Sequence, residues 1–105
     1  MDYFELEAVI EEWAYDKGIL EHSNPIKQAL KTQEELSELM EAIVDEQSGE
    51  DRGEEIKDAI GDIVVTMIIQ ARMQGLKIEE CLEHSYNVIS KRTGKMVNGK
   101  FEKDA

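Results

Sequence analysis

The stretch from Thr32 to Ala71 reads T-Q-E-E-L-S-E-L-M-E-A-I-V-D-E-Q-S-G-E-D-R-G-E-E-I-K-D-A-I-G-D-I-V-V-T-M-I-I-Q-A. It predicts two helices, because apolar residues recur at helical spacing on both sides of Ser48-Gly49, a pair that breaks helices. The connection between the two helices is short. Short connections favour antiparallel neighbours, so this stretch predicts a helical hairpin at the centre of the fold.

Acidic residues lie on one face of each helix of this hairpin. Glu35 and Glu38 are three residues apart, and Glu55, Asp58 and Asp62 follow at spacings of three and four, so each set shares a helix face. If the helices pack antiparallel, the two faces can meet. Carboxylates brought together repel one another, and hard divalent cations such as Mg²⁺ neutralise them best.

The alternative interpretation is a solvated acidic surface on two amphipathic helices, since runs of charge usually face water. Asp62 argues against it, because this residue directly precedes the apolar run 63–69. A carboxylate at the edge of such a run is costly to bury without a partner. We therefore interpret the acids as a candidate metal site.

The segment Glu34-Glu35-Leu36-Ser37-Glu38 resembles the E-E-x-x-E motif of the MazG-like all-α nucleotide pyrophosphohydrolases. The sequence departs from the second half of that family's pattern, which is E-x-x-D. Counting back three residues from Asp62, which leads into the apolar helix, gives Ala59 where a Glu is expected. An intact E-x-x-D stands one turn earlier, at 55–58. Both registers stay open, and we favour Asp62 with Asp58 as its partner and Glu55 as the alternative.

The resemblance implies an all-α fold, a four-helix bundle-like domain that forms homodimers or homotetramers. It implies hydrolysis of a nucleoside triphosphate or deoxynucleoside triphosphate to the monophosphate and pyrophosphate. Mg²⁺, with Mn²⁺ as an alternative, would activate a water for attack on the α-phosphorus. The expected metal ligands are Glu35, Glu38, Asp58, Asp62 and Glu55. Glu34 or Glu35 is the expected general base.

Five residues are candidate substrate contacts. Lys31 lies one turn ahead of the acidic cluster. The resemblance implies that Asn87, Lys91 and Arg92 contact the phosphates, and that the region of the first helix helps to cover the base. Trp13 is expected in the core, with a contact to the base as the alternative.

Composition restricts the class of protein. The 105 residues suit one domain, and a net charge of −12 argues against a general nucleic-acid binder. Residues 33–62 hold twelve acids and two bases, whereas 63–105 hold five acids and seven bases. The single Cys81 excludes an internal disulfide. No signal peptide or membrane-spanning run is evident, so we expect a cytoplasmic protein that binds no membrane.

Four helices are expected, at about 2–16, 25–47, 51–75 and 78–93. Residues 19–24 are expected as a loop and 95–105 as a polar C-terminal tail. The core positions expected on the second and fourth helices are Ile26, Leu30, Leu36, Leu39, Met40, Ile43, Ile78, Leu82, Val88 and Ile89. The run 63–69 is apolar around nearly its whole circumference, so we expect it to be buried on all sides, partly by a second chain.

Two other functions remain open. One is a phosphoribosyl-ATP pyrophosphohydrolase of related fold, which uses the same chemistry on a different nucleotide. The other is a non-enzymatic helical protein with an interaction or regulatory role, which the altered second motif keeps open.

Overall fold

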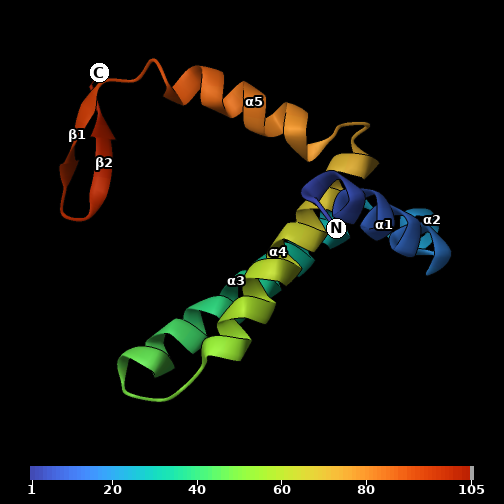
Figure 1. Cartoon of the computed structure of the whole chain (residues 1–105), viewed down its shortest axis with the longest axis horizontal. Helices are drawn as coiled ribbons and strands as arrows, with labels where there is room; N and C mark the ends of the chain where they lie inside the picture. The colour runs from blue at the N-terminus through green and yellow to red at the C-terminus, as the bar shows by residue number, and fades with distance from the viewer. Residues whose placement is uncertain (105) are drawn as a thin grey trace.

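The computed structural model describes residues 1–104, which form five helices and one β-hairpin (Figure 1). In chain order the elements are α1 (Tyr3–Asp16), α2 (Ile19–His22), α3 (Pro25–Gln47), α4 (Gly53–Met73), α5 (Ile78–Ile89), β1 (Gly94–Val97) and β2 (Lys100–Lys103). Helices α3 and α4 pack side by side as an antiparallel rod, with α1 and α2 at one end. From that end α5 projects away and carries the β-hairpin. The expected all-α fold class is confirmed.

Local capping explains where the two long N-terminal helices begin. The Asp2 side chain accepts a hydrogen bond from the backbone N–H of Glu5 at 2.9 Å, and the Asn24 side chain accepts one from Lys27 at 2.9 Å. Pro25 then occupies the first turn of α3, where its missing N–H costs nothing. Helix α3 therefore spans the range that the sequence predicts, 25–47. Among residues 1–104, no helix has the length and apolar character needed to cross a membrane.

Two expected boundaries were wrong. Residues 19–22 form the short helix α2 instead of a loop, because Gly18, at φ 78°, turns the chain sharply after α1 and lets a new helical turn begin. Helix α5 ends at Ile89 and not near Thr93. Gly94, expected to end the fourth helix, is instead the first residue of β1.

Most of the segment expected as a polar tail, 95–103, belongs to the β-hairpin, and Ala105 lies outside the described residues. Strands β1 and β2 pair antiparallel, with Met96 opposite Phe101 and Val97 opposite Lys100. Asn98 and Gly99 connect them with φ values of 50° and 80°, as a two-residue type I′ turn requires. A Cβ at Gly94 would collide with the backbone oxygen of Glu102 and with the ring of Phe101, so only glycine fits there.

The core of the single chain is thin and made mainly of small residues. Ala42 of α3 and Ala59 of α4 are buried in the helical rod, where Thr32 Oγ1 and Thr66 Oγ1 lie 2.8 Å apart. Ile68 is the one large side chain of residues 1–104 that is fully buried. Small and polar side chains along the rod let the two helices approach closely but contribute little apolar burial.

Most of the expected core positions are exposed in the single chain. These exposed positions are Ile26, Leu30, Leu36, Met40 and Ile43 on α3 and Leu82, Val88 and Ile89 on α5. The run 63–69 is not covered on all sides either, since Val64 and Met67 are each about two-fifths exposed. The physical reason is that α5 projects away from the rod instead of packing along it (Figure 1).

Ion pairs join α1 to the start of α5. Lys77 Nζ lies 3.0 Å from a carboxylate oxygen of Glu11 and 4.0 Å from Glu7. The Lys77 backbone N–H also donates to Glu80 at 3.0 Å, which caps α5. Just before it, Gly75 adopts a φ of 72°. Together these contacts set the direction in which α5 leaves the rod.

Candidate functional site

The central residue of the candidate site is Glu35, which is buried between α3 and α4. It is 5% exposed because it occupies the same heptad position as Gln28 and Ala42, the buried face of α3. Lys31 Nζ lies 3.2 Å from Glu35 Oε1, while Oε2 is buried with no hydrogen-bond partner. A buried carboxylate oxygen without a donor is costly, so this atom favours a ligand that can approach it.

An acidic cavity of about 320 Å³ lies between α3 and α4 beside Glu35. Its lining comprises Glu38, Glu41, Arg52, Glu55, Asp58, Ala59 and Asp62. The structure thus brings together four of the five expected metal ligands in one hollow. Arg52 neutralises part of the charge, since its Nη1 lies 3.1 Å from Asp45 and its Nε lies 3.8 Å from Glu55.

A second cavity, of about 420 Å³, lies on the other side of Asp62. It is lined by Trp13, Ile19, Lys27, Gln28, Lys31, Glu35, Asp62, Val65, Thr66 and Ile69. The expectation that Trp13 lies in the core was wrong, because the residue is 47% exposed and lines this cavity. Because Asp62 lines both cavities, the acidic hollow and the largely apolar one are adjacent.

The carboxylate of Glu35 shifts the pKa values of two neighbouring side chains upward. A side-chain hydrogen bond with Glu35, and then the charge of Glu35, raise the pKa of Glu38. A side-chain hydrogen bond with Glu35 likewise raises the pKa of Lys31, against the opposing effect of burial. Both shifts have the same origin, the buried carboxylate of Glu35.

The residues fit a hard divalent cation by their chemistry, although the side chains are not gathered for one. Within residues 1–104, no three His, Cys, Asp or Glu side chains are arranged to hold a metal ion. The donors available are carboxylates, which Mg²⁺ and Mn²⁺ prefer. The unpartnered oxygen of Glu35 and the raised pKa of Glu38 are both effects that a cation would relieve. Glu38, Asp58 and Asp62 are exposed, so their side chains are free to rotate toward it.

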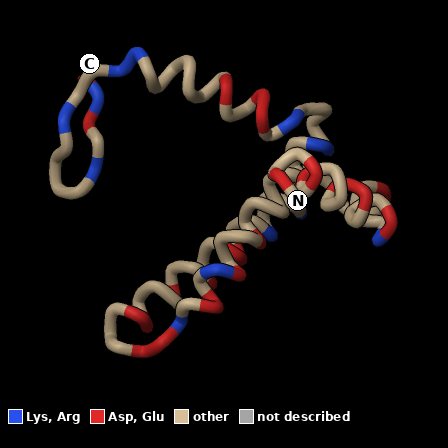
Figure 2. Tube along the Cα trace, in the orientation of Figure 1, with Lys and Arg blue, Asp and Glu red and all other residues tan. Residues whose placement is uncertain are grey.

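Four of the expected site residues lie away from both cavities. Glu34 is exposed beside Lys31, at 3.7 Å, and lines neither cavity. Asn87 lies on α5, and Lys91 and Arg92 follow it, all exposed on the part of the chain that projects away from the rod. Figure 2 shows this separation, with acidic residues along the rod and basic residues around the β-hairpin.

Several residues that the sequence interpretation did not assign line the cavities, and Glu41, Gln28 and Arg52 are among them. Glu41 is one helical turn beyond Glu38, and Gln28 is two turns before Glu35, so the helical period that placed Glu35 could have found both. Arg52 precedes α4, and no local pattern indicates that it turns toward the acids.

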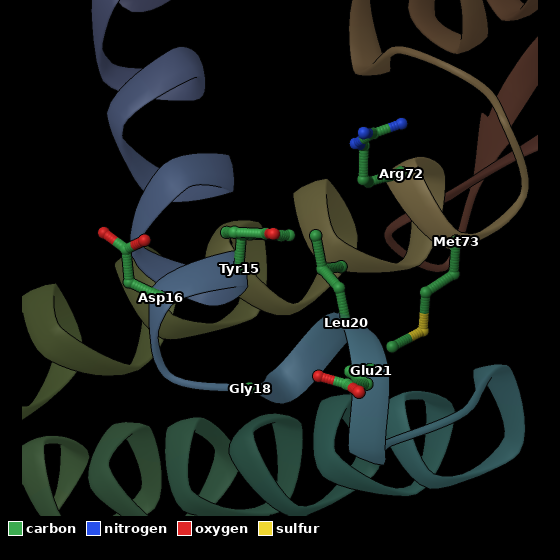
Figure 3. Close-up of a pocket in the computed structure, with 7 residues that line it drawn as sticks. All are labelled: Tyr15, Asp16, Gly18, Leu20, Glu21, Arg72 and Met73. Carbon is green, nitrogen blue, oxygen red and sulfur yellow. The ribbon is translucent and has the colours of Figure 1, made fainter.

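A larger cavity, of about 750 Å³, lies elsewhere, between the α1–α2 turn and the end of α4 (Figure 3). Tyr15, Asp16, Leu20, Glu21 and Arg72 are among its lining residues. Asp16 and Arg72 point away from one another in Figure 3, and the cavity shares no residue with the acidic one. The volume of this cavity is therefore not evidence of a functional site, because the side chains that line it do not point toward a common position.

A known protein family matches the chain over most of its length. The family model of phosphoribosyl-ATP pyrophosphohydrolase matches residues 5–86 of the chain. The chain belongs to this family. The phosphoribosyl-ATP pyrophosphohydrolase family is part of the MazG-like all-α pyrophosphohydrolase superfamily, so the resemblance is confirmed at that level. Enzymes of the family act on phosphoric anhydrides.

One curated relative is similar over part of the chain. It is an uncharacterised 18.2 kDa protein of the rep–hol intergenic region of Haemophilus phage HP1 (strain HP1c1). The two are 40% identical over 63 residues, which cover 60% of this chain and 36% of the phage protein. The chain thus matches little more than a third of that relative's length. No solved structure matches the chain.

Proposed function

We propose that the chain is a Mg²⁺-dependent pyrophosphohydrolase of the MazG-like type, which hydrolyses a nucleoside or deoxynucleoside triphosphate to the monophosphate and pyrophosphate. The observation that carries this proposal is the position of Asp62, which lines both the acidic cavity and the cavity beside Trp13. A nucleotide can then place its base and sugar against Trp13 while its phosphates reach the carboxylates. The family membership supports the reaction class.

The carboxylates of the rod would hold the cation. Glu38, Asp58 and Asp62 are the proposed ligands. Glu35 is assigned to proton transfer, and Glu55 is the alternative ligand because Arg52 already pairs with it. When bound, Mg²⁺ neutralises phosphate charge and lowers the pKa of a coordinated water. Mn²⁺ prefers similar ligands and is the expected substitute.

A buried carboxylate is the better candidate for the proton transfer. Glu35 lies within the site, whereas Glu34 is exposed beside Lys31. We therefore assign Glu35 as the base that takes the proton of the attacking water. The water oxygen bonds to the α-phosphorus, the bond from that phosphorus to the bridging oxygen breaks, and pyrophosphate leaves. Lys31, which also lines the cavity, would contact the phosphates.

The phosphate contacts expected from α5 require a second chain. Asn87, Lys91 and Arg92 lie away from the acids of their own rod, so they would act on the site of a partner in a homodimer or homotetramer. The exposed apolar positions on α3 and α5 support such an assembly, because surfaces of this kind usually contact another chain.

A second substrate is favoured by one observation, the description of the matching family. Phosphoribosyl-ATP contains the same phosphoric anhydride linkage, and the same carboxylates could act on it. The substrate therefore distinguishes the two candidates, since the reaction is shared.

The deciding experiment is a pyrophosphate-release assay, with and without Mg²⁺, over all common NTPs and dNTPs and phosphoribosyl-ATP. We expect release that depends on Mg²⁺ and is lost in Asp62→Asn but kept in Asp16→Asn. Asp16 is a matched control, because it is an exposed aspartate that lines only the unrelated cavity. No release from any substrate, together with no cation binding by calorimetry, would support the non-enzymatic alternative instead.

A further inference from the structure

The C-terminal hairpin forms a basic surface on an otherwise acidic protein. Residues 91–104 contain five basic and two acidic residues, in a chain whose net charge is −12. The basic residues are Lys91, Arg92, Lys95, Lys100 and Lys103, and all are exposed. Figure 2 shows that they gather at and just before the hairpin, far from the acidic rod of the same chain.

The hairpin has a defined turn and register, but its apolar side chains are not covered. Met96 and Phe101 face one another on one side of the two strands, yet they are 65% and 51% exposed. Within residues 1–104, β1 and β2 pack mainly against each other. Figure 1 shows the hairpin beyond the end of α5. An isolated two-stranded hairpin is marginally stable in water unless an apolar face packs against something.

A surface complementary to the hairpin exists at the tip of the α3–α4 rod, which we define as residues 41–58. This tip holds eight acidic and two basic residues. Next to these acids, Met40, Ile43 and Val44 of α3 are exposed. The tip therefore offers carboxylates to the lysines and an apolar surface to the Met96–Phe101 pair. The hairpin of the same chain does not contact it.

We propose that the hairpin of one chain docks on the α3–α4 tip of a second copy of the chain. Met96 and Phe101 would cover the exposed apolar residues of α3, while the lysines would face the acids around them. A second copy fits better than a nucleic acid, because the rest of the surface is acidic and repels polyanions. This docking goes beyond the proposed catalytic function. Glu41, Glu55 and Asp58 of the tip also line the acidic cavity, whereas Glu46 and Glu50, which the experiments below change, do not.

Cross-linking between two differently labelled chains tests the contact directly. In a Cys81→Ser background, a Lys100→Cys chain is mixed with a Glu46→Cys chain and treated with a short bismaleimide. We expect a cross-linked dimer that contains one of each. Lys17→Cys mixed with Glu46→Cys is the control, because Lys17 is an exposed lysine at the opposite end of the molecule. Equal cross-linking in the control, or none through position 100, would overturn the proposal.

A charge-swap experiment gives an independent readout. Lys100→Glu with Lys103→Glu should raise the dissociation constant of the assembly about tenfold, which corresponds to about 1.4 kcal/mol for two reversed exposed charges. Glu46→Lys with Glu50→Lys should do the same, and mixing the two double variants should restore association. An assembly that is indifferent to both changes would contradict the docking. So would binding of duplex DNA by the wild type that the hairpin variant loses, with no cross-link between chains.

Discussion

The rod made by α3 and α4 and the arm made by α5 and the β-hairpin are organised in opposite ways. In the rod, a polar carboxylate such as Glu35 is buried and apolar residues such as Ala42 and Ala59 are small. On the arm, large apolar residues such as Leu82 and Phe101 are 63% and 51% exposed, and no residue of 78–104 is buried. The rod is acidic, and the end of the arm is basic.

This difference separates two uses of the same chain. The rod buries the carboxylate of Glu35 among mainly small side chains, and a buried carboxylate is typical of a functional site. The arm keeps apolar surface available, which is typical of a segment that packs against another molecule. The predictions below test whether chemistry belongs to the rod and association to the arm.

The largest expected effect concerns the acids of α4. Asp62→Asn keeps the shape of the side chain and removes its charge, so turnover should fall at least about 100-fold. Asp58→Asn should reduce turnover severely, and Glu55→Gln should have a milder effect because Glu55 already pairs with Arg52. The measurement is pyrophosphate release, with folding checked by circular dichroism.

The opposite ranking of the same variants would identify the other register of the motif. If Glu55 and Asp58 are the essential pair, Glu55→Gln abolishes activity and Asp62→Asn is tolerated. Full activity in all three variants would remove α4 from the metal site altogether.

The second prediction compares one buried residue of the rod with one exposed residue of the arm. Ile68→Ala should lower the free energy of unfolding by about 2–5 kcal/mol, because Ile68 is fully buried. Leu82→Ala removes a residue that is 63% exposed in the single chain, so it should act through association and depend on protein concentration. Denaturant unfolding at several concentrations, with sedimentation, measures both. A chain that stays monomeric at low micromolar concentration would contradict the proposed role of the arm.

The third prediction concerns the cation and the rod. Mg²⁺ at about ten times its dissociation constant should stabilise the fold by about 1.4 kcal/mol and raise Tm by several degrees. Thermal melting with a monovalent salt of equal ionic strength is the control. The shift should disappear in Asp62→Asn and persist in Asp16→Asn. A Tm that Mg²⁺ leaves unchanged in the wild type would count heavily against a cation site.

The smallest effect is expected from Gly94→Ala. The added Cβ would collide with the Glu102 backbone, so the hairpin should open and the amide exchange of residues 95–102 should rise. The free energy of unfolding of the helices should change by less than about 1 kcal/mol, because the hairpin does not pack on them. Hydrogen exchange and circular dichroism separate these effects. Loss of helical structure would show that the hairpin supports the rod.

The sequence predicts features that local chemistry decides. Asn24 and Pro25 begin α3, and Ser48 and Gly49 follow its end, so its boundaries were predicted correctly. The meeting of Glu38 with Asp58 and Asp62 in one cavity follows from helical period and a short connection. These parts of the fold and the candidate site depend on few long-range contacts.

Other features could not be read in the same way. The direction of α5 depends on tertiary contacts of Lys77, so no periodicity could show that Leu82 would be exposed. The positions of Lys91 and Arg92 could not be predicted for the same reason, because the direction of α5 sets their distance from the acids of the rod. The hairpin is a different case, because Asn98-Gly99 between Val97 and Lys100 is a strong type I′ signal that was missed.

The connection between α4 and α5 determines where the far end of α5 lies. Helix α5 has 12 residues, which is about 18 Å of rise, and it starts just beyond Gly75. A rotation of about 10° at that glycine moves the far end of α5 by about 3 Å, roughly two residues of helical rise. The pairs of Lys77 with Glu7 and Glu11 hold the pivot. We therefore expect that a change in salt, or in one of these three side chains, would displace the lysines beyond the far end of α5 more than it displaces Lys77 itself.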